Sequence, residues 1–455
     1  MKRNIAVIIF CLFTLSVNCE TALYRIYHFQ ESIPEPILEL NPDIAFIKQN
    51  EYLDVVLDSS QLQILSSRVP LRIELLETES ELKQKLDSQY RTFPEIITLL
   101  NNYEINYSTI CKLYDIGDAW EKTVGGSSYN INYGSRDIYL LKVSDNPTLD
   151  EQEPEILIMG EHHAREPISA EMVLFIINEL LTGYGTNPDY TDWVDSYEIF
   201  FIPVLNPDGF SVVLAGDNIW WRKNCRDNDG NKSYIANNDG VDLNRNYGWF
   251  WGGTGSSANP YDEIYAGTAP FSEPEIQCIK KLANDHDFFI SVSYHTYGEY
   301  VLFPFGYDIE AQSPDYNSLQ KLAVMIASNI QNDARTGSYE PLCSKDFYPA
   351  AGDSDDWLYG NNGVFAYTIE MSSTFIPPGS SIENICERVW RGTQKIFKRL
   401  EDTYVYGNVY DKETNLPLKA RITNNHVDTT ELTPRHSHPV TGEYHWLLPQ
   451  GEFLI

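Results

Sequence analysis

Residues 155–181 read EILIMGEHHAREPISAEMVLFIINELL, and this stretch decides the fold that we expect. The apolar run at 156–159 has the length and composition of a buried strand, and residues 168–181 repeat apolar side chains at helical spacing. A polar segment that contains His163 and Glu166 lies between them. In α/β proteins, ligands bind at the carboxyl ends of the strands, so this segment is a candidate site.

The same alternation of strand and helix patterns continues from about residue 90 to about residue 400. Strand patterns occupy residues 137–143, 199–204, 288–294 and 364–371, and helix patterns occupy residues 273–285, 316–332 and 382–400. The sequence Asn206-Pro207-Asp208-Gly209 predicts a turn. This order predicts an α/β fold with a mixed, mostly parallel sheet covered by helices on both faces.

A smaller unit is expected on each side of this region. Residues 23–29, 53–57 and 71–76 have strand patterns, and Thr78 with Glu81 forms a capping-box pattern before a charged helix, so the first unit is α+β. Its polar end, with Lys83, Lys85 and Arg91, suits a cleavable linker. After residue 400, short strand candidates lie at 404–410, 419–423, 443–447 and 453–455. They predict a small all-β unit, and the sequence ends within its last strand, as a truncated product would.

The N-terminus has the pattern of a secretion signal. Lys2 and Arg3 precede an apolar run at 5–17 that is too short to span a bilayer. We therefore expect residues 1–20 to be a signal peptide and the protein to be secreted or periplasmic, without a membrane span. Cys19 is a candidate for lipid attachment, although Asn18 before it is larger than such sites usually carry.

The charge and the cysteines exclude several classes of partner and site. The net charge of −32 disfavours binding to nucleic acid or to anionic membranes, and we expect a monomer. Of the seven cysteines, five lie well beyond the signal, and they lack the spacing of a cysteine zinc site. One or two disulfides can form among them in an oxidising compartment, but the sequence does not fix the pairing.

Four residues have the types and positions of a hydrolytic zinc site. His163 and Glu166 are three apart after one strand, His295 ends a second strand, and Glu370 ends a third. Two histidines, one glutamate and an open fourth position form a hydrolytic zinc site, and a further glutamate supplies the base. Taken singly, an HxxE pair occurs by chance and a histidine at a strand tip is usually structural. His162 lies four residues before Glu166, so the spacing selects His163 instead.

Taken together, the motifs resemble those of the zinc metallocarboxypeptidases of the A, B and T types. The matching segments follow the family's order through residues 160–167, 206–209, 221–223, 240–246, 293–297, 304–307, 348–357 and 367–371. The resemblance implies an eight-stranded twisted sheet in a catalytic domain at 88–401. It also implies a propeptide-like unit at 21–87 and, at 402–455, a transthyretin-like β-sandwich unit that the end of the sequence would truncate.

The resemblance assigns catalytic roles residue by residue. One zinc ion would be bound by His163, Glu166 and His295. Glu370 would act as the general base, and Arg222 would stabilise the oxyanion. By itself, an arginine such as Arg222 more often forms surface ion pairs.

The resemblance also assigns the residues that bind the end of a peptide or protein substrate. Asn244 and Arg245 would bind the terminal carboxylate, Tyr348 would close over it, and Arg165 would assist. These residues make a peptidase the expected activity. The alternatives are a zinc deacylase or amidase on the same scaffold, and an inactive binding module.

Substrate preference is expected to depend on Asp355, which matches the floor of the specificity pocket. An aspartate there implies a preference for C-terminal Lys or Arg, while Asp353 nearby allows that apolar residues are also accepted. Gly306 would leave room on the pocket wall. Alternatively, either aspartate caps the helix that starts near Trp357.

Two further segments contain potential metal ligands. Asp227-Asn228-Asp229-Gly230-Asn231 resembles a calcium loop, but it lacks the downstream glutamate of an EF-hand, so a structural calcium ion and an ordinary polar loop both remain open. His436 and His438 could bind metal, although histidines in a polar loop are usually loop residues.

Overall fold

The computed structural model describes most of the chain, and its described residues fall into two compact units, divided between residues 81 and 82. The described residues are 21–27, 33–40, 42–48, 50–68, 71–124, 136–231, 238–401, 404–423 and 432–447. The predicted signal peptide and the strand candidate at 453–455 lie outside these ranges. Among the described residues, no helix is both long and apolar enough to cross a membrane.

The first unit contains one antiparallel sheet with the strand order β2-β3-β1-β4. The elements are β1 (Ala22–Tyr27), α1 (Glu35–Leu38), β2 (Asp43–Lys48), β3 (Tyr52–Leu57), α2 (Ser59–Arg68) and β4 (Arg72–Thr78). Its core contains Ile26, Val55 and Leu65. At the start of α3 (Glu79–Lys85), Thr78 and Glu81 exchange hydrogen bonds, as the capping-box pattern predicts. Strand β2 was not predicted.

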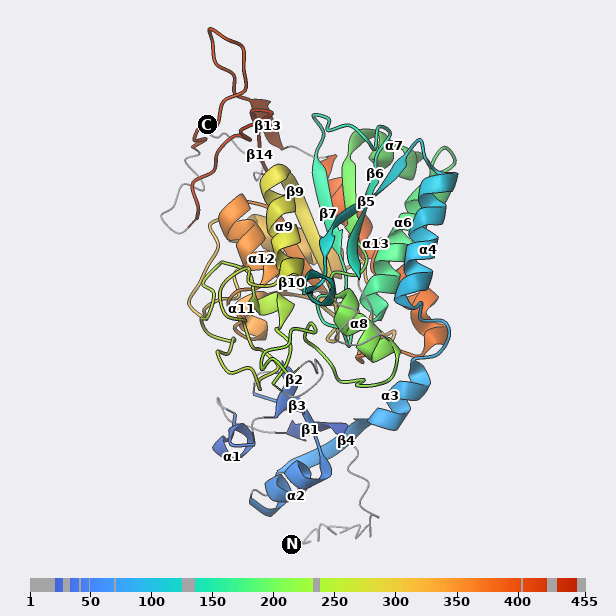
Figure 1. The fold of residues 1–455 in the computed structure, drawn as a ribbon, viewed down its shortest axis with the longest axis vertical. Helices are drawn as coiled ribbons and strands as arrows, with labels where there is room; N and C mark the ends of the chain where they lie inside the picture. The colour runs from blue at the N-terminus through green and yellow to red at the C-terminus, as the bar shows by residue number, and fades with distance from the viewer. Residues whose placement is uncertain are drawn as a thin grey trace, which may run out of the picture. The chain divides into compact units, whose positions relative to one another are not determined.

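The second unit is built on an eight-stranded mixed sheet (Figure 1). Its strand order is β11-β10-β12-β9-β7-β8-β6-β5, and four of the seven strand pairs are parallel. The strands are β5 (Cys111–Asp118), β6 (Asp137–Val143), β7 (Glu155–Met159), β8 (Glu198–Ile202), β9 (Phe288–Thr296), β10 (Tyr300–Phe303), β11 (Glu340–Cys343) and β12 (Phe365–Met371). This sheet confirms the predicted α/β class.

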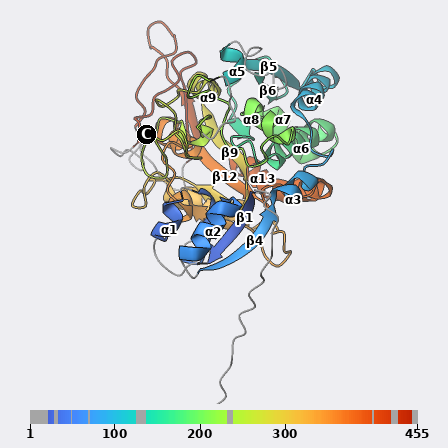
Figure 2. The same cartoon turned by 60° about the horizontal axis from the view of Figure 1, so that its bottom comes forward.

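Helices cover the sheet on both faces, as expected. Figures 1 and 2 show α9 (Pro274–Asp285) on one side of the central strands and α6 (Ile168–Gly183) with α4 (Phe93–Asn106) on the other. Ile276 and Ile279 of α9 pack in a core that includes Leu157 and Phe200. The remaining helices of eight or more residues are α7 (Pro188–Ser196), α8 (Pro207–Leu214), α10 (Tyr316–Ala327) and α13 (Ile382–Leu400).

The residues Asn206-Pro207-Asp208-Gly209 begin a helix, so the prediction of a turn was incomplete. Asn206 is the N-cap of α8, and its Oδ1 accepts a hydrogen bond of 3.1 Å from the Gly209 amide. Pro207 occupies the first helical position, where its missing N–H is not needed. A turn and a helix start share these residue types, because both need a side-chain acceptor and a fixed φ.

The C-terminal segment forms a two-stranded antiparallel sheet, β13 (Val405–Asn408) and β14 (Glu443–Trp446). The strand candidate at 419–423 contributes only a single bridge, from Arg421 to His436, among the described residues. The transthyretin-like sandwich therefore stays a prediction.

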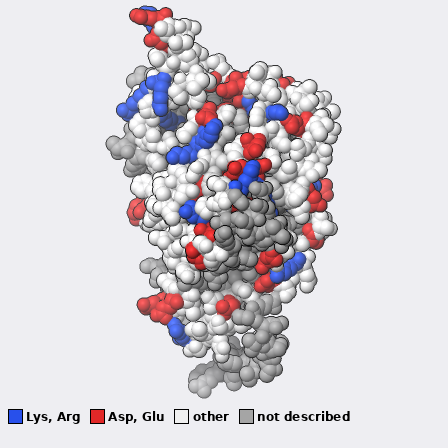
Figure 3. All heavy atoms as spheres, viewed as in Figure 1, with Lys and Arg blue, Asp and Glu red and all other residues white. Residues whose placement is uncertain are grey.

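Two further expectations concern the cysteines and the surface charge. All five described cysteines are free thiols, so the disulfides that the sequence allows do not form among them in this structure: Cys111, Cys225, Cys278, Cys343 and Cys386. On the face drawn in Figure 3, acidic side chains are scattered with basic side chains between them. The net negative charge is therefore not gathered into one patch on that face.

Candidate metal centre and substrate site

Three adjacent strands of the sheet bring the predicted metal ligands and the predicted base together. His163 and Glu166 lie in the segment between β7 and α6, and His295 lies near the end of β9, which pairs with β7. Glu370 on β12 is the parallel partner of His295. Because the ends of parallel neighbours meet at one edge of the sheet, residues far apart in sequence become neighbours there.

The side chains of His163, Glu166 and His295 converge on one point. The two histidine Nδ1 atoms lie 3.0 Å apart, and each lies 2.9 Å from a different oxygen of Glu166. All three residues are buried, and their ligand atoms form one group that could hold a metal ion. Burial alone would raise the pKa of Glu166, but His163 and His295 lower it below its usual value. This donor set of two nitrogens and one carboxylate fits a hydrolytic zinc ion.

Asp242 connects this group to two further predicted site residues. Its Oδ1 lies 3.4 Å from His163 Nε2, and its Oδ2 accepts a 2.9 Å hydrogen bond from Arg222 Nε. Asp242 also caps the short helix Leu243–Arg245 by accepting from the Asn244 amide at 2.9 Å. Sequence reasoning did not single it out, although it lies in the motif at 240–246. The only available signal was an aspartate two residues before Asn244.

His162 faces away from the convergent ligand atoms. Its Nε2 lies 2.9 Å from the Tyr247 hydroxyl, and its Nδ1 lies 3.0 Å from the Ser293 hydroxyl. Burial, and then the neighbouring His295 and His163, hold the pKa of His162 well below its usual value, so the ring is neutral. This placement agrees with the spacing argument that favours His163 as the ligand.

Glu370 has the environment of a proton-transfer group. It is 8% exposed, and burial together with the nearby Glu166 charge raises its pKa well above the usual range. Arg222 and Arg245 act in the opposite direction on the same pKa. A raised pKa brings a carboxyl group closer to the pH range in which it can both accept and return a proton.

The residues predicted to bind the terminal carboxylate lie around the same centre. Arg245 is held by the carbonyls of Gly255 and Asn244, both at 2.7 Å from guanidinium nitrogens. The Asn244 Oδ1 accepts from the Ser354 amide at 2.9 Å. Burial raises the pKa of Tyr348, and the charges of Arg245, Glu370 and Arg222 also act on it. Tyr348 is therefore electrostatically coupled to each of the three charged residues.

Arg165 is also buried. Its Nη1 donates to the Trp220 carbonyl at 3.3 Å, and its guanidinium lies 4.6 Å from the centre of the Phe375 ring. The predicted auxiliary arginine is thus fixed by protein groups.

Three neighbouring aspartates in and before α12 (Ser354–Trp357) have different partners. Asp353 is the N-cap, and its Oδ1 accepts from the Asp356 amide at 2.8 Å. Asp356 accepts from the amides of Gly306 and Tyr307 at 2.8–2.9 Å. Asp355 is 4% exposed, and it accepts hydrogen bonds from the hydroxyls of Ser354, at 3.4 Å, and Thr368. Asp353 therefore caps the helix, as the alternative interpretation predicted, and Asp355 does not.

Burial raises the pKa of Asp355 to about 8, with a further contribution from Asp353. Gly306 lies against this cluster of aspartates. A Cβ added to Gly306 would lie 2.9 Å from the Ser344 Cβ and 3.3 Å from Asp353 Oδ2, so a side chain would not fit there.

The acidic loop predicted as a possible calcium site brings Asp227, Asp229 and Asp239 together. Donors of the loop itself bind these carboxylates, including the Gly230 amide at 2.7 Å and the Asn238 amide group at 2.8 Å. Calcium binding therefore stays a prediction.

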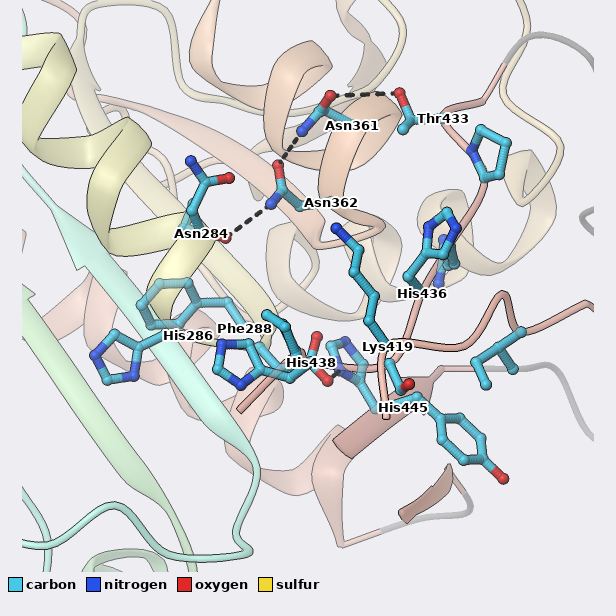
Figure 4. Close-up of a pocket in the computed structure, with 18 of the residues that line it drawn as sticks. Asn284, His286, Phe288, Asn361, Asn362, Lys419, Thr433, His436, His438 and His445 are labelled. Atoms are coloured by element: carbon cyan, nitrogen blue, oxygen red, sulfur yellow. Dashed lines mark hydrogen bonds and ion pairs between the residues drawn. The ribbon is translucent and has the colours of Figure 1, made fainter. Parts of the chain in front are cut away.

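A separate pocket lies where the C-terminal segment meets the end of α9 (Figure 4). His286, His436, His438 and His445 line it, and none of the predicted catalytic residues does. His438 accepts from the Thr441 amide at 3.3 Å, so its environment is that of a turn. We assign no metal to His436 or His438.

Comparison with known proteins adds independent information. A family model described as zinc carboxypeptidase matches residues 96–392. A zinc carboxypeptidase of Saccharothrix mutabilis subsp. capreolus is 31% identical over 297 residues, which cover 64% of this chain and 63% of that protein. Carboxypeptidase A4 of Mus musculus is 30% identical over 325 residues, which cover 70% of this chain and 68% of that protein.

A solved structure supports the fold. The crystal structure of thrombin activatable fibrinolysis inhibitor superposes with a TM-score of 0.70 at 23% identity, over 85% of this chain and 100% of that chain. At this identity the likeness concerns the fold alone.

Proposed function

Since the chain belongs to the zinc carboxypeptidase family, we propose that it binds one zinc ion and removes C-terminal residues from peptides and proteins. The observation that carries the proposal is the convergence of His163, Glu166 and His295 within 3.0 Å of one another, beside Glu370 and Arg222. His163, Glu166 and His295 would hold the ion. Zinc bound there supplies a Lewis acid and lowers the pKa of water.

Glu370 is proposed as the general base and acid. Its carboxylate would take a proton from the attacking water and then give it to the nitrogen of the leaving residue. Its raised pKa favours retention of that proton until the second transfer. A bound cation would lower the pKa and so favour the carboxylate form that accepts the proton.

Arg222 is proposed to stabilise the negative charge that develops on the carbonyl oxygen. Asp242 holds its guanidinium in place through Nε and Nη2, both at 2.9 Å. A donor that is fixed before the reaction needs no reorganisation, and loss of one such donor typically costs about 3–4 kcal/mol of barrier.

Asn244 and Arg245 are proposed to bind the terminal carboxylate, with Tyr348 and Arg165 assisting. An arginine presents parallel N–H donors that match a carboxylate. The Gly255 and Asn244 carbonyls orient that arginine. This grip would restrict cleavage to the last peptide bond, and it favours a peptidase over an amidase that acts on other groups.

Asp355 is proposed to select C-terminal Lys or Arg. It is a buried carboxylate with a raised pKa, and a bound cation would stabilise its charged form. Asp353 and Asp356 are already bound to backbone amides, so Asp355 is the aspartate left for a ligand. We further propose secretion through a signal at 1–20, a propeptide at 21–87, a catalytic domain at 88–401 and a transthyretin-like unit at 402–455.

The first experiment measures zinc content and the release of C-terminal residues from peptides ending in Arg, Lys, Phe or Leu. The purified chain is first treated with a protease such as trypsin. Glu370→Gln should retain zinc and lose at least about a thousandfold in kcat, whereas His163→Ala should lose the metal itself. Zinc-loaded protein that releases no amino acid from any peptide would refute the activity. Release only from acylated amino acids would favour the deacylase alternative.

The second experiment tests the specificity residue. Asp355→Ile should lower kcat/KM for peptides ending in Arg by about a hundredfold or more and raise it for peptides ending in Leu, because the cation loses its partner. Asp353→Ala is the matched control, since it removes a neighbouring carboxylate that serves as a helix cap. An unchanged preference for Arg in Asp355→Ile would remove the assignment.

A further inference from the structure

We infer that Ser293, His162 and Tyr247 form a hydrogen-bonded chain that holds His295 in the orientation needed to bind the metal. The inference rests on the proposed zinc site. It gives His162 and Ser293 a positioning role that neither the HxxE spacing nor the family resemblance assigns.

The chain starts at the nitrogen of His295 that does not face the metal position. Nδ1 of His295 faces His163 and Glu166, and Nε2 lies 3.0 Å from the Ser293 hydroxyl. The same hydroxyl lies 3.0 Å from His162 Nδ1, and His162 Nε2 lies 2.9 Å from the Tyr247 hydroxyl. None of the four residues is more than 1% exposed, so water does not compete for these bonds.

Metal binding at Nδ1 would fix the direction of every bond in this chain. A neutral imidazole that binds a metal through Nδ1 carries its hydrogen on Nε2, so His295 donates to Ser293. The Ser293 hydroxyl then donates its own hydrogen to His162 Nδ1. His162 in turn carries its hydrogen on Nε2 and donates to Tyr247. The two imidazoles and the Ser293 hydroxyl then each have one defined role.

The chain also ties together the separate segments that supply the ligands. Ser293 and His295 are two residues apart on β9, so their side chains lie on the same face of the sheet. His162 directly precedes His163 in the segment after β7. Tyr247 follows the short helix that contains Asn244 and Arg245. One set of hydrogen bonds therefore fixes His295 relative to the other two ligands and to the proposed carboxylate grip.

The two histidine ligands differ in what supports them. The outer nitrogen of His163 lies 3.4 Å from the charged Asp242, whereas that of His295 contacts a neutral hydroxyl backed by a buried imidazole. A hydroxyl can rotate, so it orients His295 only while His162 accepts its hydrogen. Removal of such outer partners typically lowers metal affinity 10–100-fold.

The test measures the zinc dissociation constant of the metal-free full chain by competition with a chromophoric chelator. Ser293→Ala should weaken zinc binding about 10–100-fold, and Ser293→Thr, which keeps the hydroxyl, should stay within about threefold of the wild type. Ser291→Ala is the matched control. Ser291 is on the same strand and face and is equally buried, and its hydroxyl has no hydrogen-bond partner among the described residues.

His162→Phe should weaken zinc binding in the same way. The double variant with Ser293→Ala should bind zinc about as weakly as whichever single variant has the lower zinc affinity. Both single variants should also change the visible absorption spectrum of the Co²⁺-substituted protein, which reports ligand geometry. The inference would be overturned if Ser293→Ala bound zinc with an affinity within twofold of the wild type. It would also be overturned if the losses of binding free energy in the two single variants simply added in the double variant. Failure of the wild type to bind zinc would instead refute the proposed function.

Discussion

The three aspartates of the candidate site differ mainly in which donors bind them. Asp356 accepts from the amides of Gly306 and Tyr307 and Asp353 from those of Asp356 and Asp355, whereas Asp355 accepts from the hydroxyls of Ser354 and Thr368. Burial raises the pKa of all three carboxyls, so each favours its neutral form. Asp355 has no backbone amide donor among the described residues, so we expect a bound cation to change its ionisation most.

This difference predicts a pH dependence of substrate binding. The pKa of Asp355 is raised to about 8, so below that pH the carboxyl is protonated, and binding of a cationic side chain requires loss of the proton. The KM for a peptide ending in Arg should therefore rise as the pH falls from 8 to 6, by as much as about tenfold per pH unit. Steady-state kinetics at several pH values measure this.

The control is a peptide ending in Leu, whose KM should not follow this profile. Asp355→Asn should remove the pH dependence for the Arg peptide. If the Arg and Leu peptides had parallel profiles, another group would be responsible.

Among the elements, α8 shows how one side chain can connect a helix to the site. Asn206 caps α8, and its Nδ2 also donates to the carbonyls of His162 and Lys223 at 3.3 and 3.1 Å. These carbonyls belong to the two segments that contain His163 and Arg222. The helix start therefore fixes the backbone on both sides of the proposed centre.

We expect Asn206→Ala to destabilise the protein by about 2–4 kcal/mol, because a cap and two buried hydrogen bonds are lost. Asn187→Ala is the matched control. Asn187 is the N-cap of α7, and its side chain accepts only from the Asp189 and Tyr190 amides, so its loss should cost about 1 kcal/mol. Urea unfolding monitored by circular dichroism measures both. Equal losses in the two variants would mean that the links to His162 and Lys223 do not stabilise the fold.

The sequence predicted long, mostly apolar strands better than short or polar ones. Strands β7, β9 and β12 consist mostly of apolar residues and are buried throughout, so their apolar segments identified them. Strand β5 alternates with polar residues, β10 and β11 have only four residues each, and none of these three was predicted. Short or polar strands form because a neighbour supplies hydrogen bonds, and that neighbour is distant in sequence.

The same reasoning explains which site residues were found. His163, Glu166, His295 and Glu370 were selected because spacing and strand ends are visible in a single sequence. Asp242 and Ser293 were not selected, because the contacts of Asp242 with His163 and of Ser293 with His162 join distant parts of the chain. Their functions depend on contacts that only the folded sheet creates.

The second unit as a whole contains a cluster of buried acids outside the candidate site, contributed by α5 (Trp120–Thr123), α8 and α9. Burial raises the pKa of Glu121 to about 8, that of Asp208 to about 6 and that of Glu275 to about 8. Arg136 approaches Glu121 at 3.6 Å and Asp208 at 3.3 Å. These groups join elements from distant parts of the chain, so their ionisation affects the stability of the whole unit.

The direction in which pH changes the stability follows from the raised pKa of Glu121. The folded protein holds the Glu121 proton more tightly than the unfolded chain, whose ordinary value is 4.5. This contribution to stability is complete below about pH 4.5 and is lost as the pH rises toward 8. Glu121→Gln should therefore raise the free energy of unfolding at pH 8 by at least about 1.4 kcal/mol, the equivalent of one pKa unit.

Thermal and urea unfolding at pH 5 and pH 8 would measure the effect, which should be small at pH 5. Glu310→Gln, at an exposed position, is the control and should leave the free energy of unfolding unchanged at both pH values. A Glu121→Gln variant that is no more stable than the wild type at pH 8 would contradict the prediction.

The free cysteines have a practical consequence for preparing the protein. Burial raises the pKa of the Cys111, Cys225 and Cys386 thiols, which makes them poor nucleophiles, and no described cysteine is engaged in a disulfide. The described part of the chain therefore needs no oxidant to reach its fold. It should refold equally well with or without dithiothreitol and should accumulate in folded form in the reducing cytosol of an expression host.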